Sequence, residues 1–267
     1  MYLDYWGFSE LPFENVPDPR FFYPSGDHQE ALLRMFYAVN RRKGAAMLTG
    51  EIGCGKTVIS RTLIQDLPQD RYEVGVVANP SLSPIEFLRE ILYQLGVESA
   101  DGSNLDLLQA LNDQVSKNLN AGRDTVIIID EAQAIEDPET LEELRLLLNF
   151  QFNDRFLLTL LLIGQPGLKD RIAAIKQLEQ RIAIKYHVGH LKNYETKAYV
   201  SSRMEKAGAK RKIFRDEAVD AIHKAARGTP REINNICDIS LLLGFGSRVE
   251  EVDTDLIQKA SAAVKQI

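Results

Sequence analysis

The chain has 267 residues, of which 45% are hydrophobic and 26% charged, and its formal net charge at pH 7 is -6. This length and composition predict a globular protein with one large domain or two smaller ones. The negative charge argues against nonspecific binding to nucleic acid or to an anionic membrane, because such binding needs clustered lysines and arginines.

Nothing in the cysteines or the N-terminal residues indicates export. The two cysteines, Cys54 and Cys237, do not have the spacing of metal ligands. The first residues lack the basic and then apolar layout of a signal peptide, and the longest apolar run, residues 156–164, is too short to span a bilayer. We therefore expect a cytoplasmic protein, whose cysteines stay reduced.

Residues 1–27 are rich in aromatic residues and in proline. The prolines disfavour a regular helix or a central strand, so this segment is predicted to be an extended arm. Its aromatic rings are expected to pack on the core of the protein. A helix with an apolar stripe is predicted to follow from Asp27, ahead of a short buried strand at residues 45–49.

The strand at residues 45–49 leads into the sequence GEIGCGKT at residues 50–57, which has the spacing of a phosphate-binding loop. Glycines let backbone N–H groups turn toward an anion, and the next helix presents its N-terminus to it. Lys56 is expected to reach the β- and γ-phosphates, and the Thr57 hydroxyl to ligate Mg²⁺. The alternative is a glycine-rich turn before an ordinary helix. The predicted nucleotide contacts are Gly50, Glu51, Ile52, Gly53, Cys54, Gly55, Lys56, Thr57 and Val58.

Strands and helices alternate beyond the loop. A helix at residues 58–67 precedes a strand at 72–78, and Ser83 opens the next helix with a capping box completed by Glu86. A further helix covers residues 105–119. Alternation of this kind predicts a parallel sheet with helices on both faces.

A second motif follows the β-branched run at residues 125–129, which ends in the adjacent carboxylates Asp130 and Glu131. Ligands of open α/β sheets lie at the carboxyl ends of the strands. We therefore expect Asp130 to hold Mg²⁺, and Glu131 to orient and help deprotonate an attacking water. The alternative is a polar loop after a strand, with no role in catalysis.

Two more strands, at residues 156–163 and 184–188, bring the predicted sheet to five strands. Gln165 follows the first of them, where a polar side chain would lie beside the γ-phosphate. It is therefore a candidate sensor, and a plain turn is the alternative.

The strands stop at residue 193, and four predicted helices form a compact second domain. Arg231 lies in the first turn of the third helix, where it would point at a phosphate or remain a solvated surface arginine. The predicted helices are residues 194–207, 216–227, 230–243 and 254–265.

Together these motifs resemble those of an AAA+ ATPase, and within that superfamily the ATPase domain of the ExeA/GspA family. The resemblance implies a three-layer αβα P-loop core around the parallel five-stranded sheet, followed by an all-helical lid. The expected divisions are the arm at 1–27, the nucleotide-binding core at 28–191 and the lid at 192–267. The matching residues are 1–3 (MYL), Gly7-Phe8, Pro12-Phe13, 17–23 (PDPRFFY), His28, 30–32 (EAL), 164–166 (GQP), 180–182 (QRI) and 229–234 (TPREIN).

The family resemblance also implies an activity and its residues. It implies hydrolysis of ATP with Mg²⁺, Arg231 as the second sensor, and an arginine finger supplied by a neighbouring copy in a homo-oligomer. Arg181 is the first choice for that finger and Arg171 the second. Part of the arm is a candidate for contact with the adenine, with simple core packing as the alternative.

Proteins of the ExeA/GspA family serve type II secretion, in which a cytoplasmic ATPase is joined through a membrane helix to a peptidoglycan-binding domain. No such span or domain follows the lid in this sequence, so coupling to the cell wall is not carried over. We expect a location in the cytoplasm, at most peripheral to the inner membrane through an unknown protein partner.

Two functions stay open. Glu131 favours an ATPase that assembles or remodels a partner complex in secretion or pilus biogenesis. The alternative is an ATP-gated scaffold with slow hydrolysis that associates with DNA, as transposition regulators do. The one cluster that would suit DNA, which is otherwise a solvated lid face, is Lys206, Lys210, Arg211, Lys212 and Arg215.

Overall fold

The computed structural model describes residues 2–97, 101–152 and 155–265. The chain forms two compact units, which are described one at a time. The helical unit consists of Met1–His28, Gly53–Val58 and Gly189–Ile267, and the sheet unit consists of Gln29–Ile52 and Ile59–Val188.

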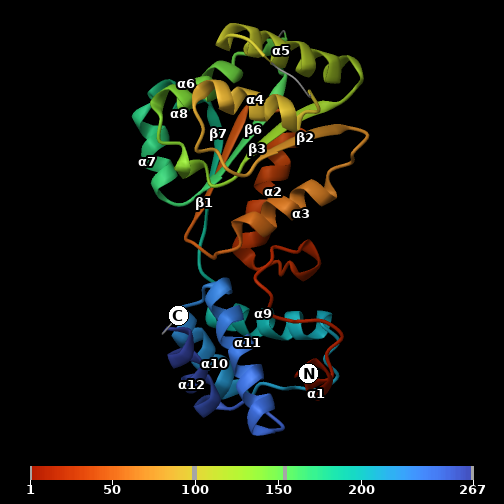
Figure 1. Cartoon of the computed structure of the whole chain (residues 1–267), viewed down its shortest axis with the longest axis vertical. Coiled ribbons are helices and arrows are strands. Elements are labelled where there is room, and N and C mark those ends of the chain that lie inside the picture. Colours follow the sequence, from red (N-terminus) through yellow and green to blue (C-terminus); the bar gives the residue numbers. More distant parts are fainter. Residues whose placement is uncertain (1, 98–100, 153–154, 266–267) are drawn as a thin grey trace. The chain divides into compact units, whose positions relative to one another are not determined.

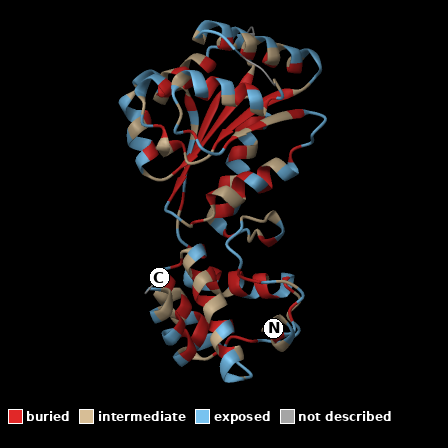
Figure 2. Cartoon of the chain, in the orientation of Figure 1, coloured by how far each residue is buried: buried red, intermediate tan, exposed pale blue. Residues whose placement is uncertain are grey.

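The sheet unit is built on five parallel strands in the order β2-β3-β6-β1-β7 (Figure 1). Every residue of β1, β3 and β6 is buried, as expected for central strands of a parallel sheet that is covered on both faces (Figure 2). The five strands are β1 (Ala45–Gly50), β2 (Tyr72–Val77), β3 (Asp124–Ile129), β6 (Leu158–Gly164) and β7 (Ile182–Val188).

Helices cover both faces of the sheet, which gives the predicted three-layer αβα arrangement. Alternate strand residues such as Met47, Ile127 and Leu160 pack against α4 to α8 in one hydrophobic core. Figure 1 shows α2 and α3 on the opposite face. These helices are α2 (Gly26–Asn40), α3 (Lys56–Asp66), α4 (Pro84–Gln94), α5 (Asn104–Asn120), α6 (Pro138–Leu147), α7 (Gly167–Ala174) and α8 (Lys176–Arg181).

Side-chain caps mark the first residues of helices α4 and α6. The Ser83 N–H donates to Glu86 Oε2 at 3.0 Å, which forms the predicted capping box of α4. Asp137 Oδ1 accepts from the Glu139 N–H at 2.9 Å at the start of α6. Among the described residues, no helix combines the length and apolar composition that crossing a bilayer requires.

The strand predicted at residues 156–163 begins later in the structure. Residues Gln151–Phe152 (β4) and Arg155–Phe156 (β5) pair with each other as a separate antiparallel ladder, and β6 starts at Leu158. The Phe156 ring packs against Gly44 so closely that an added Cβ would lie 2.9 Å from it. Phe156 thus pairs in the antiparallel ladder and not in the parallel sheet.

The helical unit contains the four C-terminal helices predicted from the sequence, and the third is longer than predicted. The last residue of α11 is Ser247, and Arg248 ends the helix in the left-handed conformation with φ 53°. The four helices are α9 (Asn193–Lys206), α10 (Asp216–Ala226), α11 (Pro230–Ser247) and α12 (Thr254–Val264).

Contrary to the sequence prediction, the N-terminal arm is not extended throughout. It contains a short helix, α1 (Tyr2–Trp6), and a 3-10 turn, η1 (Pro19–Phe21), because the first proline comes only at Pro12 and Asp18 caps the turn. Its buried aromatic rings lie within the helical unit. Those rings, Trp6, Phe8, Phe13 and Phe21, are buried in one hydrophobic core with α9 to α12.

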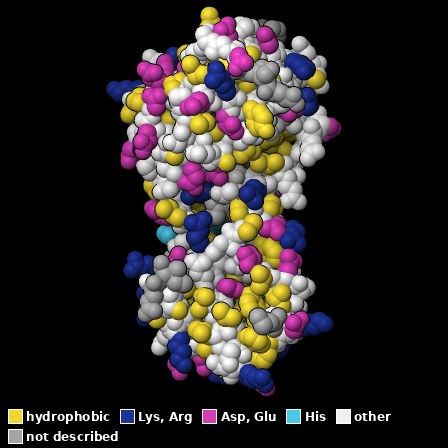
Figure 3. All heavy atoms as spheres, viewed as in Figure 1, with side chains coloured by type: hydrophobic (Ala, Val, Ile, Leu, Met, Phe, Trp, Pro, Cys, Tyr) yellow, Lys and Arg dark blue, Asp and Glu magenta, His cyan; other side chains and the backbone are white. Residues whose placement is uncertain are grey.

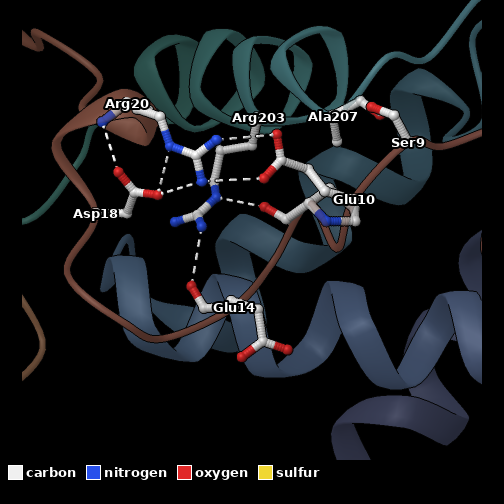
Figure 4. A network of polar contacts seen from close by, with 8 residues as sticks. Ser9, Glu10, Glu14, Asp18, Arg20, Arg203 and Ala207 are labelled. Atoms are coloured by element: carbon white, nitrogen blue, oxygen red, sulfur yellow. Dashed lines mark hydrogen bonds and ion pairs between the residues drawn. The ribbon is translucent and has the colours of Figure 1, made fainter.

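Arg203 of α9 fastens the arm to the helical unit (Figure 4). The side chain is buried, and its guanidinium donates to the carbonyl oxygens of Pro12 at 2.6 Å and Glu14 at 2.9 Å and to the Tyr199 hydroxyl at 2.8 Å. It also lies over the Phe21 ring, 4.9 Å from the centroid. The hydrogen bonds to these two carbonyl oxygens thus offset the cost of removing the charge of Arg203 from water.

We expect Arg203→Met to lower the free energy of unfolding of the helical unit by about 3 kcal/mol, because it leaves the buried Pro12 carbonyl and the partly buried Glu14 carbonyl without a charged donor. Urea titration followed by the fluorescence of Trp6, the single tryptophan, reports on this unit. The control is Arg20→Met, since Arg20 is exposed and pairs with Asp18 on the same arm. An equal decrease in the free energy of unfolding in the two variants would contradict the anchoring role of Arg203.

Candidate nucleotide-binding site

The glycine-rich loop joins β1 to α3. Gly50 is the last residue of β1 and Lys56 the first of α3. Gly53 and Gly55 have φ values of 80° and 90°, a region in which other residues are strained. Successive backbone N–H groups can converge on one anion in such a loop, at the N-terminus of a helix.

The side chains of the loop differ in exposure. Ile52 is 59% exposed, and Glu51 is also exposed. Lys56 is 95% covered, while Thr57 and Val58 are half-buried. Cys54 is fully buried, with its Sγ 3.8 Å from His190 Nδ1. The loop therefore offers an ammonium, a hydroxyl and backbone N–H groups, whereas its thiol is shielded from solvent.

Within the helical unit, the loop touches the start of α11. The Arg231 N–H donates to the Gly53 carbonyl at 3.3 Å, and a Cβ on Gly53 would lie 2.8 Å from the Arg231 Cβ. The Arg231 side chain is exposed. Thr229 stands at the N-cap of α11, but its hydroxyl makes no capping hydrogen bond and pairs with His190 Nδ1 at 3.0 Å.

The paired carboxylates lie in the sheet unit, directly after β3. The Asp130 N–H donates to the Val77 carbonyl at 3.0 Å, and the Glu131 N–H donates to Asp130 Oδ1 at 2.9 Å. Glu131 has φ 50° and ψ 36°, a left-handed conformation that is uncommon outside glycine. It begins the short 3-10 helix η2 (Ala132–Ala134). Backbone strain of this kind is frequent at functional sites.

Two glutamines hold the Glu131 carboxylate. Gln133 Nε2 donates to Glu131 Oε2 at 2.5 Å, and Gln165 Nε2 donates to the same oxygen at 3.3 Å. The Gln165 N–H donates to Gln133 Oε1 at 2.8 Å, which closes the network. Gly164 lies close to this network, since an added Cβ would lie 2.6 Å from Gln133 Oε1 and would displace that amide. The predicted sensor Gln165 therefore lies beside the predicted base.

The sequence pattern did not single out Gln133 or His28 as site residues. Gln133 could have been found from the sequence, because it lies two residues after Glu131 in the same motif. His28 is one of the residues that match the ExeA/GspA family. Nothing in its local sequence shows that its ring binds the Cys54 carbonyl oxygen at 2.8 Å.

Neither candidate arginine finger extends freely from the sheet unit. Arg181 donates to the Leu148 carbonyl at 2.7 Å, and Arg171 donates to the Ile135 carbonyl at 3.0 Å. Both side chains are half-buried. A guanidinium has further donors, so either arginine keeps N–H groups for another acceptor, and the choice between them stays open.

Four of the five residues of the basic cluster have a hydrogen-bond or ion-pair partner within the helical unit. Lys206 donates to the Phe22 carbonyl at 2.8 Å. On the face visible in Figure 3, basic side chains are scattered among acidic and apolar ones. The other pairings are Lys212 with Asp216 at 2.7 Å, Arg215 with Glu251 at 2.8 Å and Arg211 with the Glu250 carbonyl.

Comparison with known proteins identifies the family. The sequence model described as "AAA domain" matches residues 39–172, which include the loop and the paired carboxylates. General secretion pathway protein A of Aeromonas hydrophila is 39% identical over 249 residues, which are 92% of this chain and 45% of that protein. The chain thus spans less than half the length of this relative. The predicted resemblance to the ExeA/GspA family is confirmed.

Solved structures confirm the fold class. The Aeropyrum pernix ORC2 protein in ADPNP and ADP complexes has a TM-score of 0.74 at 19% identity, over 96% of this chain and 72% of that chain. The Thermotoga maritima RuvB Holliday junction branch migration motor has a TM-score of 0.59 at 18% identity, over 90% and 69%. At these identities the likeness concerns the fold alone. The chain belongs to the AAA domain family and is an AAA ATPase related to general secretion pathway protein A.

Proposed function

We propose that this protein binds ATP, hydrolyses it, and uses the cycle to assemble or remodel a partner complex. The supporting observation is that the loop and the carboxylates follow β1 and β3, two parallel strands with only β6 between them. Parallel strands that pair in one sheet present their carboxyl ends at one edge, which is where such sheets take their ligands.

In this proposal, the loop binds the phosphates. The backbone N–H groups of the loop and the N-terminus of α3 attract anionic oxygens, and the buried ammonium of Lys56 adds a point charge. Arg231 serves as the second sensor. The Thr57 hydroxyl and the Asp130 carboxylate are hard oxygen donors, which fit Mg²⁺. When bound, Mg²⁺ would supply positive charge to the phosphate oxygens.

Glu131 is the proposed base. Its carboxylate orients the attacking water and accepts a proton from it, while the amides of Gln133 and Gln165 fix the position of Oε2. A positioned base of this kind contributes roughly 10²- to 10⁴-fold to a rate. An arginine from a neighbouring copy, with Arg181 as first choice, supplies a further donor to the transferring phosphoryl group.

The proposed oligomer acts on a component of a secretion-related assembly, because the relative covering 92% of this chain is named for the general secretion pathway. A location at the cytoplasmic side of the inner membrane, reached through that partner, is part of the proposal. A DNA-associated scaffold is less well supported, because most of the basic cluster pairs within the helical unit.

Lys56→Ala is expected to weaken ATP binding by about 100-fold, because several charge-assisted contacts to phosphate oxygens are lost together. Isothermal titration calorimetry with Mg-ATP measures this change. Lys185→Ala is the control, since Lys185 is a surface lysine paired with Glu179. Unchanged affinity in the Lys56 variant would refute the assignment of the phosphate loop.

Gln133→Leu should lower kcat for ATP hydrolysis by about tenfold while leaving ATP affinity unchanged, because the Glu131 carboxylate loses its shortest donor. Steady-state assays and calorimetry separate these two effects. In the Glu131→Gln background the same change should have no further effect on kcat. A loss of equal size in both backgrounds would mean that Gln133 does not act through Glu131.

A mixing experiment tests the finger from the neighbouring copy. Arg181→Ala and Glu131→Gln should each bind ATP and hydrolyse it poorly, since a finger is worth roughly 10³ to 10⁵ in rate. In mixed oligomers, an Arg181→Ala subunit contributes an intact Glu131 to a neighbour that keeps Arg181, so activity should recover. No recovery where ATP-dependent oligomers form would exclude Arg181, and the same mixture with Arg171→Ala then decides between Arg171 and a monomeric mechanism.

A further inference from the structure

His28 lies between Ser25 and the backbone of the glycine-rich loop. Its Nε2 is 2.8 Å from the Cys54 carbonyl oxygen, and its Nδ1 is 2.6 Å from Ser25 Oγ. The His28 side chain is 4% exposed and the Ser25 side chain 3%. All of these residues belong to the helical unit. A buried ring thus connects the arm to the loop.

The contacts of the ring determine which nitrogen carries the proton. A carbonyl oxygen only accepts, so Nε2 must donate to Cys54. Ser25 Oγ accepts from the His28 backbone N–H at 3.4 Å, which leaves its hydroxyl proton for Nδ1. Burial lowers the pKa of His28 below its usual value, so the ring is neutral at pH 7. The structure therefore requires the neutral tautomer with hydrogen on Nε2.

The Cys54 carbonyl fixes the orientation of a whole peptide plane. In a trans peptide the C=O and the N–H point in opposite directions, so the Gly55 N–H points away from the ring. Rotation of this plane by half a turn changes the ψ angle of Cys54 and the φ angle of Gly55 together, and Gly55, with φ 90° and no side chain, accepts φ values of either sign. Gly55 therefore permits both the conformation that binds an anion and the rotated conformation that does not.

The ring fits closely against the loop and is supported from the arm. A Cβ on Gly55 would lie 2.9 Å from His28 Nε2. The Phe22 ring packs edge-on against the His28 ring at a centroid distance of 6.3 Å. The neighbouring Asp27 accepts from the Gly189 N–H at 3.1 Å, which fixes the backbone beside the ring. The ring has little freedom to follow a rotating peptide.

We propose that His28, oriented by Ser25, is a positioning residue for phosphate binding. It holds the peptide between Cys54 and Gly55 so that the Gly55 N–H faces the phosphate and the Cys54 carbonyl faces away. In the rotated peptide a carbonyl oxygen would meet the phosphate oxygens and repel them. This inference rests on the proposed binding of ATP at the loop.

The test compares His28→Ala, His28→Gln and Ser25→Ala by calorimetry with Mg-ATP and with ADP. His28→Ala should weaken both nucleotides by about 10- to 100-fold. His28→Gln should recover most of this loss, because its amide N–H reaches the same carbonyl. Ser25→Ala should lose about threefold, because the ring keeps its donor but loses its orientation.

The matched control is His223→Ala. His223 lies in the same unit, and its Nδ1 also pairs with a hydroxyl, Thr196 Oγ1, at 2.8 Å. Its removal should leave nucleotide affinity unchanged. Fluorescence of Trp6 shows whether each variant is folded.

Nitrogen NMR of the wild-type protein tests the tautomer without any variant, and should find the proton on Nε2 of His28. A proton on Nδ1, or wild-type affinity in a folded His28→Ala variant, would overturn the inference. If the wild-type protein binds ATP and Lys56→Ala does not, such a result contradicts only the role of His28. If neither binds ATP, the proposed function itself fails.

Discussion

The proposed site depends on the parallel pairing of three neighbouring strands, β3, β6 and β1. Parallel strands deliver the residues that follow them to one edge of the sheet. β1 is continued by the glycine-rich loop, β3 by Asp130 and Glu131, and β6 by Gln165. The pairing of Ile129 with Leu162 brings the ends of β3 and β6 together, so Gln165 can reach Glu131. A helix between successive strands makes this parallel order possible.

The glycine-rich loop needs support from outside itself. Glycines at 53 and 55 supply the required φ angles, but they also give the loop alternative conformations. Contacts within the helical unit restrict them, since the Arg231 N–H binds the Gly53 carbonyl and His28 binds the Cys54 carbonyl. The same unit buries the arm through Trp6 and Arg203. Residues 1–28 therefore contribute to the core of the helical unit and, through His28, contact the backbone of the loop.

The fold was predictable wherever local chemistry decides the outcome. The β-branched residues 125–129 and the capping residues Ser83 and Asp137 specify their elements from sequence alone. Contacts between distant residues were not predictable in this way. The aromatic residues of the arm predict that the arm is buried, but not which core it joins. The pairing of the Thr229 hydroxyl with His190 likewise joins residues far apart in the chain. The amide of Gln133 could likewise have faced solvent, and its bond with the Gln165 N–H joins residues 32 positions apart in the chain.

Glu131 combines a strained backbone with a firmly held carboxylate. A left-handed conformation outside glycine costs of order 1–3 kcal/mol. Hydrogen bonds to a charged group contribute about 1.5–3 kcal/mol each, so the donors from Gln133 and Gln165 offset that cost. The amide of Gln165 has two N–H donors, and the bond to Glu131 uses one of them. The second can bind another acceptor, such as a phosphate oxygen, without releasing Glu131. In the proposed mechanism, a single amide therefore both senses the nucleotide and positions the base.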